Sequence, residues 1–118
     1  MTSAELCDLV VDGMTEKKAE DVVVLDLQGV NNAIASYFVI CSGNSDTHVE
    51  AISDSIEEVV YKRSNQSPWH REGVQNKEWI LIDYVDVVVH IFKKEKRSFY
   101  ALEDLWGDAV ISHIETSA

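Results

Sequence analysis

The feature that most constrains the fold is the stretch WILIDYVDVVVHIF, which spans residues 79–92. It is apolar and rich in β-branched residues, so it predicts two strands, about 78–84 and 86–92. We take Tyr84 and Val85 as the turn that joins them into an antiparallel hairpin. This register predicts three cross-strand pairs: Asp83 with Asp86, Leu81 with Val88, and Trp79 with His90. Valine suits such a turn poorly, because its positions need positive φ and favour glycine or asparagine.

The two faces of this hairpin differ, because side chains alternate along a strand. One face is aliphatic and should carry the helices and the core: Ile80, Ile82, Val87, Val89 and Ile91. The other is mixed: Trp79, Leu81, Asp83, Asp86, Val88, His90 and Phe92. Covering an unpaired carboxylate is costly, so we expect this second face to be at least partly open, like a protein-binding surface with aromatic anchors and a polar rim. The alternatives are a merely solvated side or a C-terminal tail that folds over Trp79 and Phe92.

The rest of the chain predicts helices and strands around the hairpin. The expected elements are a helix over about 3–18 capped by Thr2 or Ser3, strands at 21–27 and 36–42, a helix capped by Ser45 or Asp46, a loop at 64–76 with a short edge strand near 69–72, a last helix from about 94–96 to 106, and a loose tail after about 108. The order α-β-β-α-β-β-α indicates an α/β (α+β) fold, a single mixed β-sheet with helices packed on it, in one domain over residues 1–118.

The charge of the chain narrows the choice of partner. Twenty-one acidic residues against 10 basic ones give a formal net charge of −11. Such a chain repels phosphate backbones, so we expect no direct sequence-specific binding of nucleic acid and favour a basic protein partner. The alternative is that the acidity only keeps the protein soluble.

The cysteines and the apolar runs bear on the compartment. Cys7 and Cys41 are far apart in apolar surroundings and are expected to be reduced core residues. No apolar run reaches the roughly 18 residues of a membrane span, and the acidic N-terminus is unlike a signal peptide. These observations predict a cytoplasmic protein without a membrane partner.

An enzyme is the competing interpretation. Asp83 and Asp86 could hold a divalent ion, and the turn Gly43, Asn44 and Ser45 could hold a phosphate at a helix N-terminus, which together would suit nucleotidyl or phosphoryl transfer. The turn lacks the lysine of a phosphate-binding loop, and no basic cluster lies near either segment. We therefore favour a protein that is not an enzyme and has no cofactor.

Four blocks of the sequence resemble the ribosomal silencing factor family, also called the Iojap family. They are DVVVLDLQGV (21–30), YFVICSGNSDTHVEAISDSIEE (37–58), WILIDYVDVVVHIF (79–92) and RSFYALEDLWGDA (97–109). The resemblance implies a fold similar to nucleotidyltransferases without their catalytic carboxylates. It also implies binding to the large ribosomal subunit through its protein number fourteen, which blocks joining of the small subunit and represses translation.

The resemblance also supplies candidate partner-binding residues where the blocks match. They are Trp79, Asp83, Tyr84, Asp86, His90, Phe92, Arg97 and Tyr100. The family usually has glycine where this chain has Val85, at the turn that the geometry also singles out. An exposed apolar face without its partner could also pair with a second copy in a symmetric homodimer.

Overall fold

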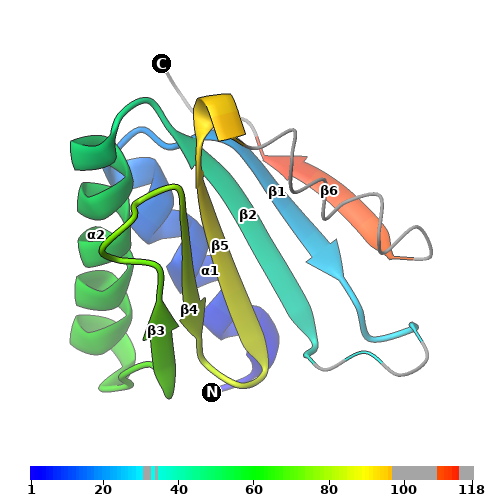
Figure 1. Cartoon of the computed structure of the whole chain (residues 1–118). Coiled ribbons are helices and arrows are strands. Elements are labelled where there is room, and N and C mark those ends of the chain that lie inside the picture. The colour runs from blue at the N-terminus through cyan, green and yellow to red at the C-terminus, as the bar shows by residue number, and fades with distance from the viewer. Residues whose placement is uncertain (31–32, 34, 97–108, 115–118) are drawn as a thin grey trace.

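The computed structural model describes residues 1–30, 33, 35–96 and 109–114. Within these ranges the elements are α1 (Ser3–Glu16), β1 (Glu20–Asp26), β2 (Tyr37–Gly43), α2 (Asp46–Ser64), β3 (His70–Glu72), β4 (Trp79–Asp83), β5 (Val87–Lys93) and β6 (Val110–Ile114). The strands form one sheet in the order β3-β4-β5-β2-β1-β6, and α1 and α2 both pack on the same face of it (Figure 1). The predicted single sheet with helices packed on it is confirmed.

The sheet is mixed because its two central strands run in the same direction. β2 pairs with β5 in parallel, whereas the other four neighbouring pairs are antiparallel. Side chains of β2 and β5 are buried on both faces, apart from the partly buried Tyr37 and Lys93 at opposite ends. This explains why both strands read as continuous apolar runs rather than as an alternation of apolar and polar residues.

The helices begin where the capping residues predict. Thr2 Oγ1 accepts a hydrogen bond from the Glu5 backbone N–H at 3.1 Å, and Glu5 Oε1 accepts from the Thr2 N–H at 3.3 Å, which forms a capping box. Ser45 Oγ caps α2 by accepting from the His48 N–H at 3.1 Å. Both caps satisfy backbone donors that a helix start leaves without partners.

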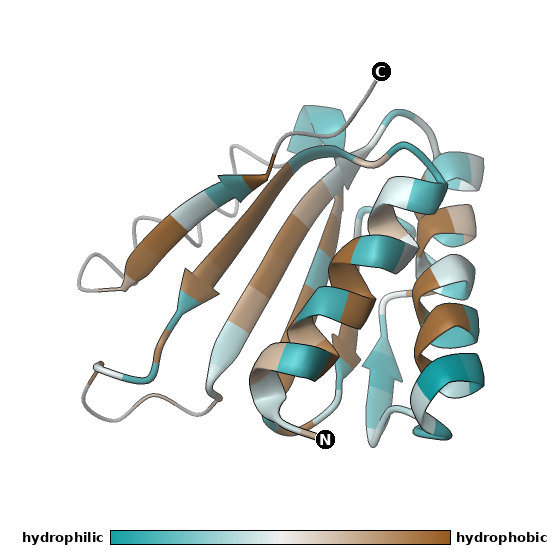
Figure 2. Cartoon of the chain, turned by 180° about the vertical axis from the view of Figure 1, so that it is seen from behind, coloured by the Kyte–Doolittle hydropathy of each residue, from teal (hydrophilic) through white to brown (hydrophobic). Residues whose placement is uncertain are grey.

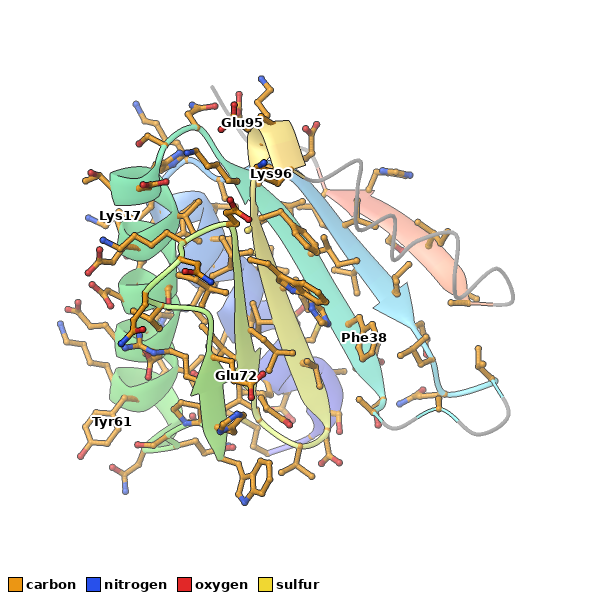
Figure 3. The ribbon with its side chains drawn as sticks, viewed as in Figure 1. Lys17, Phe38, Tyr61, Glu72, Glu95 and Lys96 are labelled. Atoms are coloured by element: carbon orange, nitrogen blue, oxygen red, sulfur yellow. The ribbon has the colours of Figure 1, made fainter. Side chains whose placement is uncertain are left out.

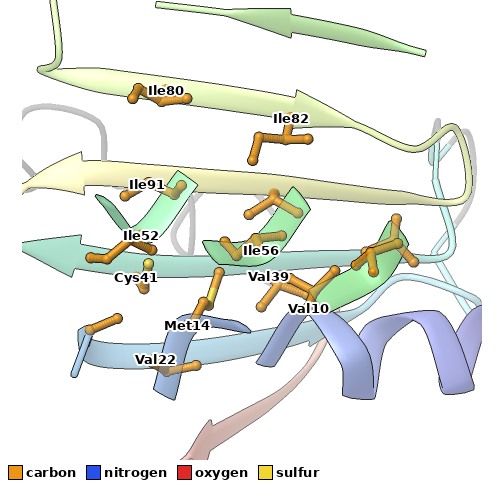
Figure 4. Packing of buried hydrophobic residues seen from close by; sticks show 14 of the residues in the cluster. Val10, Met14, Val22, Val39, Cys41, Ile52, Ile56, Ile80, Ile82 and Ile91 are labelled. Carbon is orange, nitrogen blue, oxygen red and sulfur yellow. The ribbon is translucent and has the colours of Figure 1, made fainter. Parts of the chain in front are cut away.

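The two helices cross very closely at Gly13. A Cβ atom on Gly13 would lie 2.6 Å from Ile56 Cα, and Ser55 Oγ donates a hydrogen bond to the Gly13 carbonyl at 2.8 Å. Their apolar sides turn toward the sheet (Figure 2). Figure 4 shows Met14 and Ile52 among the aliphatic side chains that fill the layer between helices and strands.

The cysteines belong to this core, as predicted. Cys7 and Cys41 are buried and are not joined in a disulfide bond. Burial raises the pKa of the Cys7 thiol to about 12, so the thiol stays protonated at neutral pH. Among the residues described, no helix combines the length and apolar character that a membrane crossing requires.

The C-terminal region departs from the prediction. The tail expected to be loose instead forms β6 over Val110–Ile114, which pairs with β1 and places Leu25 opposite Ile111. The predicted edge strand near 69–72 is confirmed as β3. The predicted last helix falls mostly outside the described residues, which here include only a turn of 3₁₀ helix at 94–96.

Candidate protein-binding site

The alternation along β4 and β5 sorts the side chains as predicted. The aliphatic residues are fully buried beneath the helices: Ile80, Ile82, Val87, Val89 and Ile91. We call the opposite side the tryptophan face: Trp79, Leu81, Asp83, Val88, His90 and Phe92. Neither α1 nor α2 covers this face, which Figure 1 shows toward the viewer. The expected orientation of Trp79, away from these helices, is therefore confirmed.

The pairing register differs from the prediction by two residues. The observed partners are Trp79 with Phe92, Leu81 with His90, and Asp83 with Val88. The strands are joined by a longer turn than expected, inside which Tyr84 N–H donates to the Val87 carbonyl at 2.9 Å. A shift of two residues leaves every side chain on its predicted face, because the side-chain period of a strand is two.

The turn has the strained conformation that Val85 leads one to expect. Val85 has a φ of 75°, and the Asp86 N–H donates to the Tyr84 carbonyl at 3.0 Å, which together describe a γ-turn. Positive φ is rare for β-branched residues. The Asp83 carboxylate accepts a hydrogen bond from the Val85 N–H at 2.7 Å, so one of its oxygens supports the turn.

The centre of the tryptophan face is a buried aromatic cluster. Its ring centroids are separated by 5.2 Å for Trp79 and Phe92, 5.8 Å for Trp79 and His90, and 4.9 Å for His90 and Phe38, the last pair packing edge to face. Figure 3 shows Phe38 on β2, on the viewer's side of the sheet. The face is thus partly open, as predicted, but its apolar side chains also pack on one another and on Val30, Ala33, Ala35 and Ala109.

A hydrogen bond joins the tryptophan to the histidine within this cluster. The indole Nε1–H of Trp79 donates to His90 Nδ1 at 3.0 Å. Burial lowers the pKa of His90 to about 4, so the imidazole is neutral at physiological pH. Because the indole can only donate, Nδ1 is the acceptor and the proton of the neutral ring lies on Nε2.

The candidate residues therefore divide into those that a partner can contact and those that support them. Trp79 and Asp83 are partly buried and Asp86 is exposed, so these three remain available to a partner. His90 and Phe92 lie on the expected face but are only 4% and 1% exposed, so they support Trp79 instead of contacting a partner directly. Arg97 and Tyr100 lie outside the described residues.

Tyr84 requires a correction. It is 7% exposed and packs in the core on the helix-covered side, together with Ile80 and Ile82. Burial raises the pKa of its hydroxyl. The alternation that separates the two faces already assigns this position to the aliphatic side, so Tyr84 is removed from the candidate contact residues.

The sequence interpretation missed an exposed aromatic residue beside Asp83. Trp69 is 74% exposed and Val85 59% exposed, and together with Asp83 and Val88 they line a hollow of about 360 Å³. On the neighbouring strand β3, His70 Nε2 lies 2.8 Å from Glu72 Oε1. The signal available in the sequence was the tryptophan directly after the loop residue Pro68, ahead of a short edge strand.

The groups considered above for phosphate binding form hydrogen bonds and ion pairs with other residues of the chain, and those considered for metal binding, which the structure describes, form no metal-binding group. The Asn44 N–H donates to His48 Nδ1 at 2.8 Å, the His48 N–H donates to Ser45 Oγ, and Asp46 pairs with Lys93 at 3.0 Å. The start of α2 thus directs these backbone donors to the chain's own side chains. Within the described ranges, no three His, Cys, Asp or Glu side chains are grouped so that they could hold a metal ion.

Comparisons with known proteins agree with this arrangement. The family model described as "Ribosomal silencing factor during starvation" matches residues 1–118. Ribosomal silencing factor RsfS of Halalkalibacterium halodurans is 42% identical over 115 residues, which cover 98% of this chain and 97% of that protein. The chloroplastic protein Iojap of Zea mays is 32% identical over 95 residues, which cover 80% of this chain and 40% of that protein.

A solved structure supports the same fold. A crystal structure of a Bacillus halodurans protein superimposes with a TM-score of 0.78 at 38% identity, covering 95% of this chain and 98% of the other. The mixed sheet, with helices on one face and an aromatic cluster with an acidic rim on the other, defines a class of α+β domain with a candidate binding face. The chain belongs to the ribosomal silencing factor family, RsfS, which the sequence resemblance predicted.

Proposed function

We propose that the protein binds the large ribosomal subunit through a basic ribosomal protein, number fourteen of that subunit, and represses translation in the cytoplasm by keeping the small subunit from joining. The observation that carries this proposal is the partly exposed Trp79 on the face of the sheet that α1 and α2 leave free. Membership in the ribosomal silencing factor family supports it.

The charge around the tryptophan face favours a basic partner. Glu72 on β3 and Asp86 in the β4–β5 turn are exposed, and Asp83 is partly exposed between them. Figure 3 shows Glu72 on the edge strand beside this face. Acidic groups around an aromatic anchor form a polar rim that selects a partner of opposite charge and excludes RNA phosphates.

The proposed mechanism is steric and assigns no reaction to the chain. A domain seated on the surface where the two subunits meet blocks their approach without chemistry. A calorimetric titration with magnesium and a nucleoside triphosphate checks this part: no saturable heat is expected. Saturable binding that is lost in Asp86→Asn would instead support the transferase interpretation.

The test of the binding face is the variant Trp79→Ala. Truncating an aromatic anchor at the centre of an interface costs about 2 kcal/mol or more, which is roughly a thirtyfold loss of affinity. Co-sedimentation with purified large subunits measures this loss. The matched control is Tyr61→Ala, because Tyr61 is 56% exposed and points outward from α2 (Figure 3). Unchanged binding of a folded Trp79→Ala protein would refute the assignment of this face.

A second copy of the chain is the other occupant to test. If the tryptophan face also pairs two chains when no ribosome is present, a symmetric dimer results. Sedimentation velocity over a range of concentrations is then expected to show a dimer for the wild type and a monomer for Trp79→Ala. A dimer that persists in Trp79→Ala places any self-association on another surface.

A further inference from the structure

The contacts around Trp79 restrict the orientation of its indole ring. Trp79 and His90 are diagonal neighbours across β4 and β5, because Trp79 pairs with Phe92 and His90 pairs with Leu81. Long aromatic side chains span such a diagonal. One side of the indole packs at 5.2 Å from the Phe92 ring, and its only donor meets His90 Nδ1 at 3.0 Å.

The imidazole that accepts this hydrogen bond is itself fixed in place. It packs edge to face on Phe38 and lies parallel to the Phe92 ring, with an interplanar angle of 9°. At 4% exposure it has almost no surface to offer a partner. A side chain so placed can influence binding only through the residues that it contacts.

We propose that His90 is a positioning residue, whose Nδ1 holds the Trp79 indole in one orientation before the partner arrives. This role presupposes the binding face proposed above. A rigid anchor binds more tightly than a mobile one, because the loss of side-chain freedom has already occurred in the free protein. His90 thus contributes to affinity without touching the partner.

Three substitutions separate the hydrogen bond from the packing. His90→Phe keeps an aromatic ring and removes the acceptor. His90→Asn keeps an acceptor at the position of Nδ1, whereas His90→Gln places its acceptor one bond further along the side chain. Leu25→Val is the control for general loss of packing, because Leu25 on β1 belongs to the same buried cluster but is not one of the rings that hold His90 or Trp79.

Two measurements report on the proposal. The first is the Trp79 indole N–H resonance in a proton–nitrogen correlation spectrum, assigned with Trp79→Phe. The second is the affinity for purified large ribosomal subunits. We expect His90→Phe and His90→Gln to shift the resonance upfield and to weaken binding by about five- to tenfold, the scale set by immobilising one side chain. His90→Asn and Leu25→Val are expected to keep both close to the wild type.

A double variant completes the test. Because His90 acts through Trp79, Trp79→Ala combined with His90→Phe should bind no more weakly than Trp79→Ala alone. If Trp79→Ala weakens binding but His90→Phe and His90→Gln do not, His90 has no positioning role and the binding face stands. If Trp79→Ala binds as the wild type does, the binding face itself is refuted. Should His90→Phe fail to fold, the comparison of His90→Asn with His90→Gln decides.

Discussion

Val85 adopts a backbone conformation that valine normally avoids. Its φ of 75° lies in the left-handed region, which costs an L-residue about 1–2 kcal/mol. The conformation persists because three groups hold it: the Asp83 carboxylate on the Val85 N–H, the γ-turn bond from Asp86, and the bond from Tyr84 to Val87. The strain is therefore maintained by the turn around it.

Replacing Val85 by glycine should relieve this strain. Glycine adopts positive φ freely but loses roughly 0.5–1 kcal/mol through the greater freedom of its unfolded chain. We expect Val85→Gly to raise the free energy of unfolding by up to about 1 kcal/mol, measured by urea denaturation. The control is Val110→Gly, since Val110 is also exposed but lies in strand β6, where glycine should destabilise. A loss of stability in both variants would contradict the account of the turn.

The roles of single residues could be predicted only where the alternation of side chains along a strand determines them. The period of two assigned Trp79 to one face and Ile80 to the other. It could not reveal that His90 is covered, because burial on the tryptophan face depends on Phe38, which is distant in sequence and arrives through the parallel pairing of β2 with β5. Tyr84 was misplaced because the family resemblance was followed where the alternation pointed the other way.

The elements themselves were largely predictable, whereas their register and the last strand were not. Apolar periodicity and the caps at Thr2 and Ser45 located the helices. A pattern of alternation carries no information on turn length, so the hairpin register was wrong by two residues although both faces were right. β6 was missed although three of its five residues are valine or isoleucine, because its place near the end of the chain was taken as the sign of a loose tail.

The crossing of α1 and α2 gives a prediction at the level of elements. An alanine in the middle of a helix normally stabilises it by up to about 1 kcal/mol relative to glycine. At Gly13 the added methyl group would meet the backbone of Ile56 at 2.6 Å. We therefore expect Gly13→Ala to lower the free energy of unfolding by about 1–3 kcal/mol, the usual cost of overpacking.

Urea denaturation followed by circular dichroism measures this change. Gly29→Ala is the comparison variant, because a Cβ atom at Gly29 meets nothing within 4 Å. It should leave stability nearly unchanged. An equal or greater stability of Gly13→Ala would mean that the helices separate without cost, and the close crossing would then contribute nothing to the fold.

At the scale of the whole molecule, the net charge of −11 should raise the rate at which the protein associates with a basic partner. Opposite charges steer partners together over a screening length of about 10 Å at 0.1 M salt, which falls to about 3 Å at 1 M. Raising potassium chloride from about 50 to about 300 mM should therefore slow association with the isolated basic ribosomal protein about tenfold and change dissociation little.

Surface plasmon resonance with that ribosomal protein immobilised separates these two rates. Trp79→Ala serves as the reference, since loss of an anchor should speed dissociation and leave the salt dependence of association intact. Association that does not respond to salt would show that charge complementarity plays no part in the encounter.

The parallel seam between β2 and β5 has a consequence for how the chain acquires its shape. The hairpins β1–β2 and β4–β5 each form between segments that are close in sequence. The parallel pairing that joins them sets Tyr37 opposite Val87 and Gly43 opposite Lys93, and α2 lies between these two strands in the sequence. Closing so large a loop is slow compared with forming either hairpin. During synthesis the two halves of the sheet can therefore pair only after β5 has been made. The chain can complete its fold only when most of its length has been synthesised.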